Sequence, residues 1–517
     1  MNLNDLNREQ RLAAETLEGP LLVLAGAGSG KTRALTYRVA NLLEHGVPPW
    51  AIMAITFTNK AAKEMRERIE KLAGAGAEDI WVSTFHSGCA KILRRDIEKL
   101  GYTRSFTIYD DDDQMSALKE ILKKLNIDDK FLPPREIKSK ISDAKNKLLG
   151  PQDWFSQSER DYRSQLVYDV YQAYEEKMKS SNALDFDDLI VKTLELFAQH
   201  PPVLEAYQRK VRYIHVDEYQ DTNYAQYMLV RLLAAQSRNL CVVGDDDQSI
   251  YGWRGGDAAL FDGIEAPLRL LAPDVRHETL TANWRSCRQI IAHNNALFSP
   301  LEDASVARQA LSALMPQETP DDLLDSYAKR VAAGYAGTAQ DFSPSSPSGG
   351  LVRVEAIDAD NSEELNAAVL GRLRHVLRQE LAPHRPWQDM LVLVRSNAQA
   401  ALVAEDLAAA DIPIVTENSL LLSTHPLVIQ SVALLQFLCN AEDELALWTV
   451  VTGSLVQQGP LPVPDLQALH DSCVGRGSIP LVQHLQQGFP EFWTAVLAPF
   501  HNQAGLMTPY DTVMEWY

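Results

Sequence analysis

A glycine-rich segment carries the first candidate chemistry of this 517-residue chain. The apolar run Leu21–Leu24 predicts a strand, and a helical pattern begins near Arg33. Between them stand Ala25, Gly26, Ala27, Gly28, Ser29, Gly30, Lys31 and Thr32. Such a loop can aim backbone N–H groups and a helix N-terminus at phosphate oxygens. Lys31 would reach the β- and γ-phosphates, and the Thr32 hydroxyl would ligate Mg²⁺. An ordinary flexible turn is the alternative, although Gly-Lys-Thr at a strand–helix junction rarely arises by chance.

Acidic side chains follow two later apolar runs, Tyr213–Val216 and Leu240–Val243. Parallel strands place such residues at one edge of a sheet, beside the phosphate loop. Asp217 suits a carboxylate that holds Mg²⁺, and Glu218 suits a group that orients the attacking water. Gln248 could hydrogen-bond both a γ-phosphate and that water. A lone Asp-Glu pair is usually a solvated strand end, but the upstream phosphate loop favours the catalytic interpretation.

Aromatic and basic residues follow Gln248 in a polar segment bounded by glycines. Tyr251 and Trp253 offer flat faces on which unpaired bases can stack, and Arg254 adds a cation. The alternative is that both aromatic residues belong to the hydrophobic core.

The elements that must position these residues alternate between strand and helix. The patterns predict strands at 21–24, 51–57, 80–83, 213–216 and 240–243, with helices at 6–17, 31–45 and 60–72. This alternation indicates an α/β fold with a parallel sheet. Residues 91–189 read as a charged helical insertion. The Ser/Pro/Gly-rich stretch 341–350 reads as a linker, Met390–Val394 as the first strand of a second α/β pattern, and the last 90 or so residues as mainly helical.

Composition limits the possible partners. The formal net charge of −20 argues against a protein that coats nucleic acid indiscriminately, although a local basic groove remains compatible with it. The Lys and Arg residues between Arg135 and Lys147 form either a phosphate-contacting surface or a solvated helix face. The run Asp110–Asp113 predicts an acidic helix start. No apolar run has the length of a membrane span and no signal segment is visible, so we expect a cytoplasmic protein without membrane partners.

These motifs together resemble a superfamily 1 DNA helicase of the UvrD/Rep/PcrA group. The matching segments, in the family's order, are Leu6–Gln10, Ala25–Thr32, Ile55–Ala62, Thr84–Ser87, Asp185–Leu189, Val216–Thr222, Gly244–Gly256 and Leu280–Ser286. The resemblance implies a P-loop NTPase with RecA-like parallel-sheet motor domains and helical insertions. It implies a first motor domain at 1–90 and 190–278, a DNA-contacting helical insertion at 91–189, a partial second motor domain at 279–423, and the start of a second insertion at 424–517.

The resemblance also assigns site residues. Lys31, Asp217, Glu218 and Gln248 would serve hydrolysis, and Arg285 would reach the γ-phosphate as an arginine finger. The nucleotide-binding set would be Gln10 on the adenine edge, Ala25 through Thr32, Arg33, Arg38 and the stacking Trp284. Thr32 and Asp217 would hold Mg²⁺. The single strand would contact Thr56, Phe57, Asn59, His86, Tyr251, Trp253 and Arg254.

The chain departs from the family pattern in several places. Ala25 replaces the usual first glycine of the loop, and Trp284 replaces the usual stacking tyrosine. Two later motifs, Thr-x-His-x-x-Lys-Gly-Leu-Glu and Thr-Arg-Ala, are missing, so the sequence reads as a C-terminally truncated helicase. After about residue 257 it resembles the RecB/AddA side of the superfamily loosely, and only Lys329 among the lysines comes after Lys210. These two changes suggest a mosaic of two sources.

The predicted function is therefore that of an ATP- and Mg²⁺-dependent motor on single-stranded DNA and at junctions with duplex DNA, 3′-to-5′ by resemblance, in repair or recombination. The alternative is an ATP- and DNA-binding fragment, or a scaffold subunit of a helicase–nuclease complex with repair or nuclease partner proteins.

Overall fold

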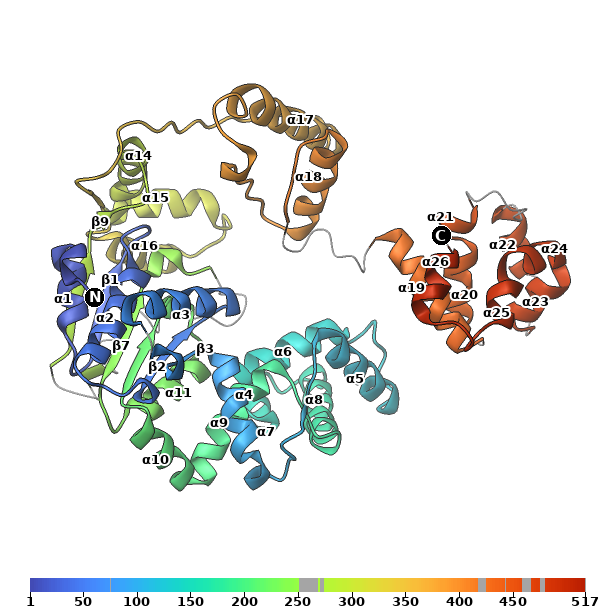
Figure 1. Ribbon diagram of the computed structural model, residues 1–517, viewed down its shortest axis with the longest axis horizontal. Helices are drawn as coiled ribbons and strands as arrows, with labels where there is room; N and C mark the ends of the chain where they lie inside the picture. The colour runs from blue at the N-terminus through green and yellow to red at the C-terminus, as the bar shows by residue number, and fades with distance from the viewer. Residues whose placement is uncertain are drawn as a thin grey trace. The chain divides into compact units, whose positions relative to one another are not determined.

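The computed structural model describes residues 1–74, 76–250, 268–269, 274–416, 425–441, 443–457, 466–474 and 479–516 (Figure 1). These residues form two compact units, Met1–Arg353 and Val354–Tyr517, and each is described by itself. Among the described residues, no helix has the length and apolar character needed to cross a membrane.

A six-stranded parallel sheet organises the first unit, with the order β3-β2-β6-β7-β1-β8. The strands are β1 (Leu21–Ala25), β2 (Ile52–Thr56), β3 (Trp81–Thr84), β6 (Tyr213–Val216), β7 (Leu240–Gly244) and β8 (Arg276–Leu280). The sequence predicted five of these strands to within about two residues. The near-continuous apolar composition of β1, β2 and β7 is typical of parallel strands that are buried on both faces.

Alternate residues of each strand enter two different hydrophobic cores. Leu22, Met53 and Ile214 belong to one core, whereas Leu21 and Ile52 belong to the other. The first core also receives α4 (Phe85–Asp96), α9 (Phe186–Gln199), α10 (Pro201–Lys210) and α11 (Tyr224–Ala234). The second receives α1 (Arg8–Glu15), α2 (Lys31–Glu44) and α3 (Asn59–Ala73). The sheet is therefore covered by helices on both faces, as predicted.

A helical insertion with its own core follows α4. It contains α5 (Asp111–Lys124), α6 (Pro134–Asn146), α7 (Pro151–Gln157) and α8 (Tyr162–Ser180), with a small sheet of β4 (Thr107–Ile108) and β5 (Ala183–Leu184). Asp110 caps α5 through bonds from the N–H groups of Asp112 and Asp113 at 2.9 Å. The acidic run is therefore a helix start, as predicted.

The chain after β8 folds back against the sheet domain. It forms β9 (Ala282–Asn283), α14 (Arg288–Phe298), α15 (Ala304–Leu314), α16 (Asp321–Tyr335) and β10 (Asp341–Phe342). The prediction of a linker from residue 341 was wrong at its start, because β10 pairs in parallel with β9. Ser343 and Ser346 are buried, and the Ser346 hydroxyl donates to the Asn283 carbonyl at 3.3 Å. The Ser343 and Ser346 hydroxyls also bond to each other, so Ser346 links this stretch to β9.

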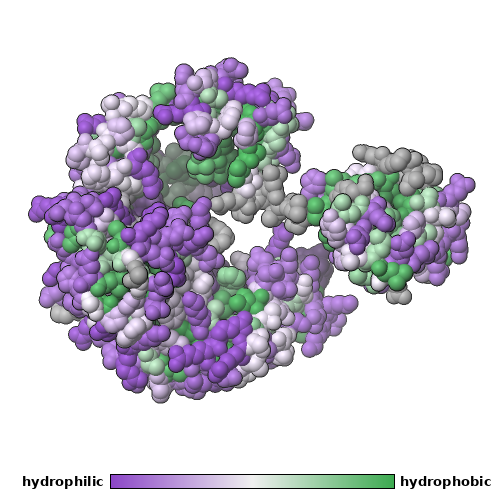
Figure 2. Space-filling view, in the orientation of Figure 1, coloured by the Kyte–Doolittle hydropathy of each residue, from purple (hydrophilic) through white to green (hydrophobic). Residues whose placement is uncertain are grey.

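The second unit is helical in its described part. Its first segment holds α17 (Ser362–His375) and α18 (Asn397–Ala409) around Leu377, Leu407 and Ile412. The predicted strand at Met390–Val394 was wrong: this stretch is extended but unpaired, and Leu391 and Leu393 are each 88% exposed. A parallel strand needs a neighbouring strand, and none is present among the described residues of this unit. Figure 2 shows hydrophobic surface over this segment.

The rest of the second unit is a helical cluster around Leu434, Phe437 and Leu447. Its helices are α19 (Pro426–Cys439), α20 (Glu444–Val451), α21 (Ser454–Gln457), α22 (Leu466–Val474), α23 (Leu481–Gly488), α24 (Pro490–Phe492), α25 (Ala498–Asn502) and α26 (Pro509–Trp516). The helical prediction for these residues is confirmed in the described part of the chain.

Candidate nucleotide site

The glycine-rich loop joins β1 to α2 at the carboxyl edge of the sheet. Gly28 and Gly30 have φ angles of +75° and +89°, a left-handed conformation that favours glycine. Gly30 is the N-cap of α2, so the loop leads directly into the positive end of that helix. This is the arrangement that phosphate binding requires.

The end of β6 brings two carboxylates to the start of α2. Lys31 Nζ lies 2.9 Å from Glu218 Oε2, and the Thr32 hydroxyl donates to Asp217 Oδ2 at 3.2 Å. Lys31 and Asp217 are both buried. Four residues chosen from two distant parts of the sequence are therefore in contact.

Thr32 and Asp217 fit a magnesium site. Burial, with the neighbouring Glu218 charge, raises the pKa of Asp217 to about 6. The protein alone therefore does not fully offset the negative charge of this carboxylate. The described residues contain no cluster of three or more His, Cys, Asp or Glu side chains suited to a metal. Mg²⁺ commonly takes only one or two protein ligands and completes its shell with phosphate oxygens and waters. One hydroxyl and one carboxylate beside a phosphate loop match that donor set.

Glu218 is held in an unusual backbone conformation. Its φ of +52° is uncommon for a residue other than glycine, and such strain concentrates at functional sites. Its carboxylate also accepts a bond from Gln220 Nε2 at 2.8 Å, and Gln220 Oε1 accepts from the Asp245 N–H at 3.1 Å. Gln220 therefore joins the ends of β6 and β7. Gln220 was not among the predicted site residues, although it stands within the motif that contains both carboxylates.

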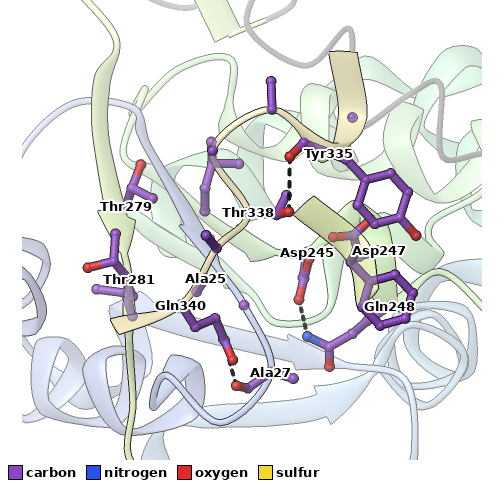
Figure 3. A pocket seen from close by; sticks show the side chains of 18 of the residues that line it. Ala25, Ala27, Asp245, Asp247, Gln248, Thr279, Thr281, Tyr335, Thr338 and Gln340 are labelled. Atoms are coloured by element: carbon purple, nitrogen blue, oxygen red, sulfur yellow. Dashed lines mark hydrogen bonds between the residues drawn. The ribbon is translucent and has the colours of Figure 1, made fainter. Parts of the chain in front are cut away.

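Gln248 lies at the edge of a cavity of about 730 Å³ beside the phosphate loop (Figure 3). Its side-chain amide donates to Asp245, whose pKa is raised by burial. Residues 25–27 of the loop line the same cavity, as do residues 333–340. Gln248 and the loop thus face one space.

A turn after β9 docks on the phosphate loop. The Trp284 N–H donates to the Gly28 carbonyl, and Asn283 Nδ2 donates to the Ala27 carbonyl, both at 2.9 Å. Asn283 Oδ1 accepts from the backbone of Arg285 at 2.9 Å. A Cβ atom on Gly28 would come within 2.9 Å of Arg285 Cβ. Trp284 and Arg285 are therefore beside the loop, and Trp284 is 43% exposed.

The remaining predicted nucleotide-binding residues have protein partners in this structure. Gln10 Nε2 donates to the Ser29 carbonyl of the loop at 2.8 Å. Arg33 donates to the Asp5 carbonyl at 2.8 Å. Arg38 is fully buried and its guanidinium binds the carbonyls of Ala13 and Leu17, which ties α1 to α2. In this structure Arg38 stabilises helix packing.

The predicted DNA-contacting residues that the structure describes lie at the ends of β2 and β3. The Phe57 ring packs on Phe85, and the His86 ring lies 5.1 Å from that of Phe186. The Asn59 side chain accepts a bond from Ser87 at 3.5 Å. Phe186, which is 54% exposed, was not among the predicted residues, although its segment, Asp185–Leu189, was recognised as a motif. Thr56 is buried, and Tyr251, Trp253 and Arg254 lie outside the described residues.

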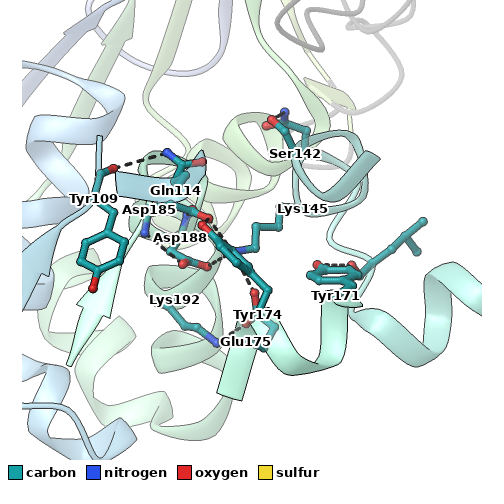
Figure 4. Close-up of polar contacts among 12 residues, drawn as sticks. Tyr109, Gln114, Ser142, Lys145, Tyr171, Tyr174, Glu175, Asp185, Asp188 and Lys192 are labelled. Carbon is teal, nitrogen blue, oxygen red and sulfur yellow. Dashed lines mark hydrogen bonds and ion pairs between the residues drawn. The ribbon is translucent and has the colours of Figure 1, made fainter. Parts of the chain in front are cut away.

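Lys145 fits neither interpretation of the basic stretch, because it is neither a phosphate-contacting surface residue nor part of a solvated helix face. Its ammonium is buried and lies 2.8 Å from Asp185, 2.7 Å from Asp188 and 2.8 Å from Glu175 (Figure 4). Burial alone would lower the pKa of Lys145, but the three carboxylates raise it well above its usual value. The adjacent Asn146 accepts a bond from Asn223, the N-cap of α11, at 2.7 Å. Lys145 therefore attaches the insertion to the sheet domain.

Comparison with known proteins agrees with this geometry. The family model for the UvrD/REP helicase N-terminal domain matches residues 6–268. The chain belongs to the UvrD/REP helicase family. Like other UvrD/REP chains it has an α/β, P-loop, RecA-like sheet domain, as predicted.

Curated relatives of this UvrD/REP chain are longer than the chain itself. It is 39% identical to the ATP-dependent DNA helicase PcrA of Staphylococcus aureus (strain Mu50) over 467 residues, 90% of this chain and 58% of the relative. PcrA of Bacillus subtilis (strain 168) is 53% identical over 297 residues, 57% of this chain and 40% of the relative. The matched part of the chain thus spans 58% of the length of the first relative and 40% of the second.

Proposed function

We propose that this UvrD/REP chain binds ATP with Mg²⁺ and hydrolyses it as a motor on single-stranded DNA. The observation that carries the proposal is the meeting of Lys31, Thr32, Asp217 and Glu218 at the start of α2. The relatives named as ATP-dependent DNA helicases support the choice of ATP and DNA.

Hydrolysis would use the contacts already present. Lys31 would exchange Glu218 for a phosphate oxygen, which frees the Glu218 carboxylate to orient a water against the γ-phosphate. Arg285, on the turn bound to Gly28 and Ala27, would stabilise the charge that develops in the transition state. Mg²⁺ held by Thr32 and Asp217 would neutralise charge on the β- and γ-phosphates.

Single-stranded DNA would lie across the carboxyl ends of β2 and β3. His86 and the exposed Phe186 form an aromatic pair there, and Phe57, which directly follows β2, packs on Phe85, the neighbour of His86 in the chain. Aromatic faces stack on bases of any sequence. The distinction between RNA and DNA depends instead on contacts to the 2′-hydroxyl. We also propose that the motor moves in the 3′-to-5′ direction and separates duplex DNA in repair or recombination. Both points rest on the family resemblance.

A second candidate function is nucleotide and DNA binding without autonomous unwinding, as a scaffold in a helicase–nuclease complex. The exposed leucines of the unpaired stretch 390–394 favour it, because the described residues of the second unit form no sheet that could close on ATP.

Steady-state ATP hydrolysis with and without single-stranded DNA tests both candidates. DNA should stimulate hydrolysis, and Lys31→Ala should abolish it. Lys71→Ala, at an exposed lysine in the last turn of α3, should leave hydrolysis unchanged. Binding of both ligands without stimulated turnover would support the second candidate. A wild-type chain that fails to bind ATP would refute both, and equal stimulation by single-stranded RNA would refute the choice of DNA.

A further inference from the structure

Gln340 contacts the phosphate loop from outside the part of the chain that the family model matches. It directly precedes β10, whereas the match ends at residue 268. Its Nε2 donates to the Ala27 carbonyl at 2.9 Å, and its Oε1 accepts from Asn283 Nδ2 at 2.8 Å (Figure 3). One side chain thus joins the loop to the residue that orients the Arg285 turn.

The contact between Gln340 and the loop is close. A Cβ atom on Gly26 would lie 2.5 Å from Gln340 Nε2, so a glycine at position 26 leaves room for this amide. The Ala27 carbonyl also accepts from Asn283 Nδ2 at 2.9 Å. Two donors therefore occupy both lone pairs of one carbonyl oxygen.

The backbone around Gln340 is anchored on both sides. Its N–H donates to Asn295 Oδ1 at 3.0 Å, and its carbonyl accepts from Asn295 Nδ2 at 2.9 Å. The next N–H, of Asp341, donates to the Thr281 carbonyl at 2.9 Å. The Gln340 amide is consequently positioned before any ligand arrives, which limits the entropy lost when the site is used.

Fixing the Ala27 carbonyl also fixes an N–H group. The described backbone contains no cis peptide, and in a planar trans peptide the C=O and the following N–H point in opposite directions. Donors on the Ala27 oxygen therefore direct the Gly28 N–H to the other side of the loop. An N–H held in this way can bind an anion without first reorganising the loop.

We propose that Gln340 is a positioning residue of the nucleotide site, which holds the Ala27 carbonyl so that the first half of the loop is ready for the phosphates of a nucleoside triphosphate. The inference rests on the proposed function, because it assumes that this loop binds ATP. It assigns a role at the phosphate loop to the segment between α16 and β10.

The test uses Gln340→Met, which keeps the length and bulk of the side chain but removes both hydrogen bonds. Its matched control is Gln309→Met on the exposed face of α15. Titration calorimetry should show that the Kd for ATP with Mg²⁺ rises about three- to tenfold in Gln340→Met, the worth of about one hydrogen bond. The Tm, the Kd for single-stranded DNA and the control should match the wild type.

A double-mutant cycle with Asn283→Ala adds a second measure. Both side chains act on one carbonyl, so their effects on the Kd for ATP should be non-additive. An unchanged Kd in Gln340→Met, or a lowered Tm with an unchanged Kd, would overturn the inference, as would strictly additive effects. If the wild type binds ATP and Lys31→Ala does not, such a result leaves the proposed function standing; if the wild type binds no ATP, both are overturned.

Discussion

Replacing Lys145 by methionine should destabilise the first unit substantially. The change removes an ammonium that lies within 2.8 Å of three carboxylate oxygens and keeps most of the side-chain volume. Asp185 and Asp188 are as buried as Lys145, so they would lose their cation without gaining water. Breaking a buried ion pair from one side costs about 3–5 kcal/mol. For a 353-residue unit that unfolds with about 2 cal/mol/K of entropy per residue, the Tm should fall by about 4–7 °C.

Differential scanning calorimetry of three variants would measure this effect. Lys147→Met alters an exposed lysine of the same helical region and should leave the Tm within about 1 °C of the wild type. Adding Asp188→Asn to Lys145→Met should recover part of the lost stability, because it removes one of the unpaired charges. A wild-type Tm for Lys145→Met would refute the view that this ion cluster attaches the insertion to the sheet domain.

Three further outcomes are expected. Phe186→Ala should raise the Kd for single-stranded DNA at least about fivefold, measured by fluorescence anisotropy. The control Phe131→Ala, in the insertion, should leave this Kd unchanged. An equal rise of the Kd in both variants would contradict a specific stacking role for Phe186. Asp217→Asn should lower ATP turnover by on the order of 100-fold at saturating ATP, and turnover within twofold of the wild type would exclude Asp217 as the magnesium ligand. Burial and the Asp185 charge raise the pKa of Asp187 to about 6, so its protonated form stabilises the folded state and this contribution is lost as the pH rises through 6. Asp187→Asn should therefore lose less stability between pH 4 and pH 7 in urea unfolding, and an unchanged pH profile would contradict the shift.

The sheet and the phosphate loop could be predicted because their signals are local. Strands buried on both faces are short apolar runs, and the loop combines glycines, Lys31 and Thr32 within one turn. The order of the strands then places Asp217 near Thr32, since the carboxyl ends of parallel strands share an edge.

The errors arose where non-local partners decide the outcome. Lys145 stands in a basic stretch, and its carboxylate partners lie 30 to 43 residues away on α8 and α9. The apolar run Met390–Val394 is typical of a buried strand, but strand formation depends on neighbouring strands that the described residues of this unit lack. Gln340 could not be predicted as a site residue, because a single amide side chain before a loop-like stretch forms no motif with a recognisable residue spacing.

The place of β8 in the sheet limits how the chain can be dissected. β8 pairs with β1 from Leu21 to Ala25, yet it begins at Arg276, beyond the end of the family match. A fragment cut at residue 268 would leave β1 as an edge strand, with unpaired backbone groups that invite pairing with other chains. The same cut would remove every contact that residues 283–340 make with the phosphate loop. An isolated nucleotide-binding fragment should therefore extend to Arg353, and the aggregation of any shorter one would report on its open edge rather than on the chemistry of its site.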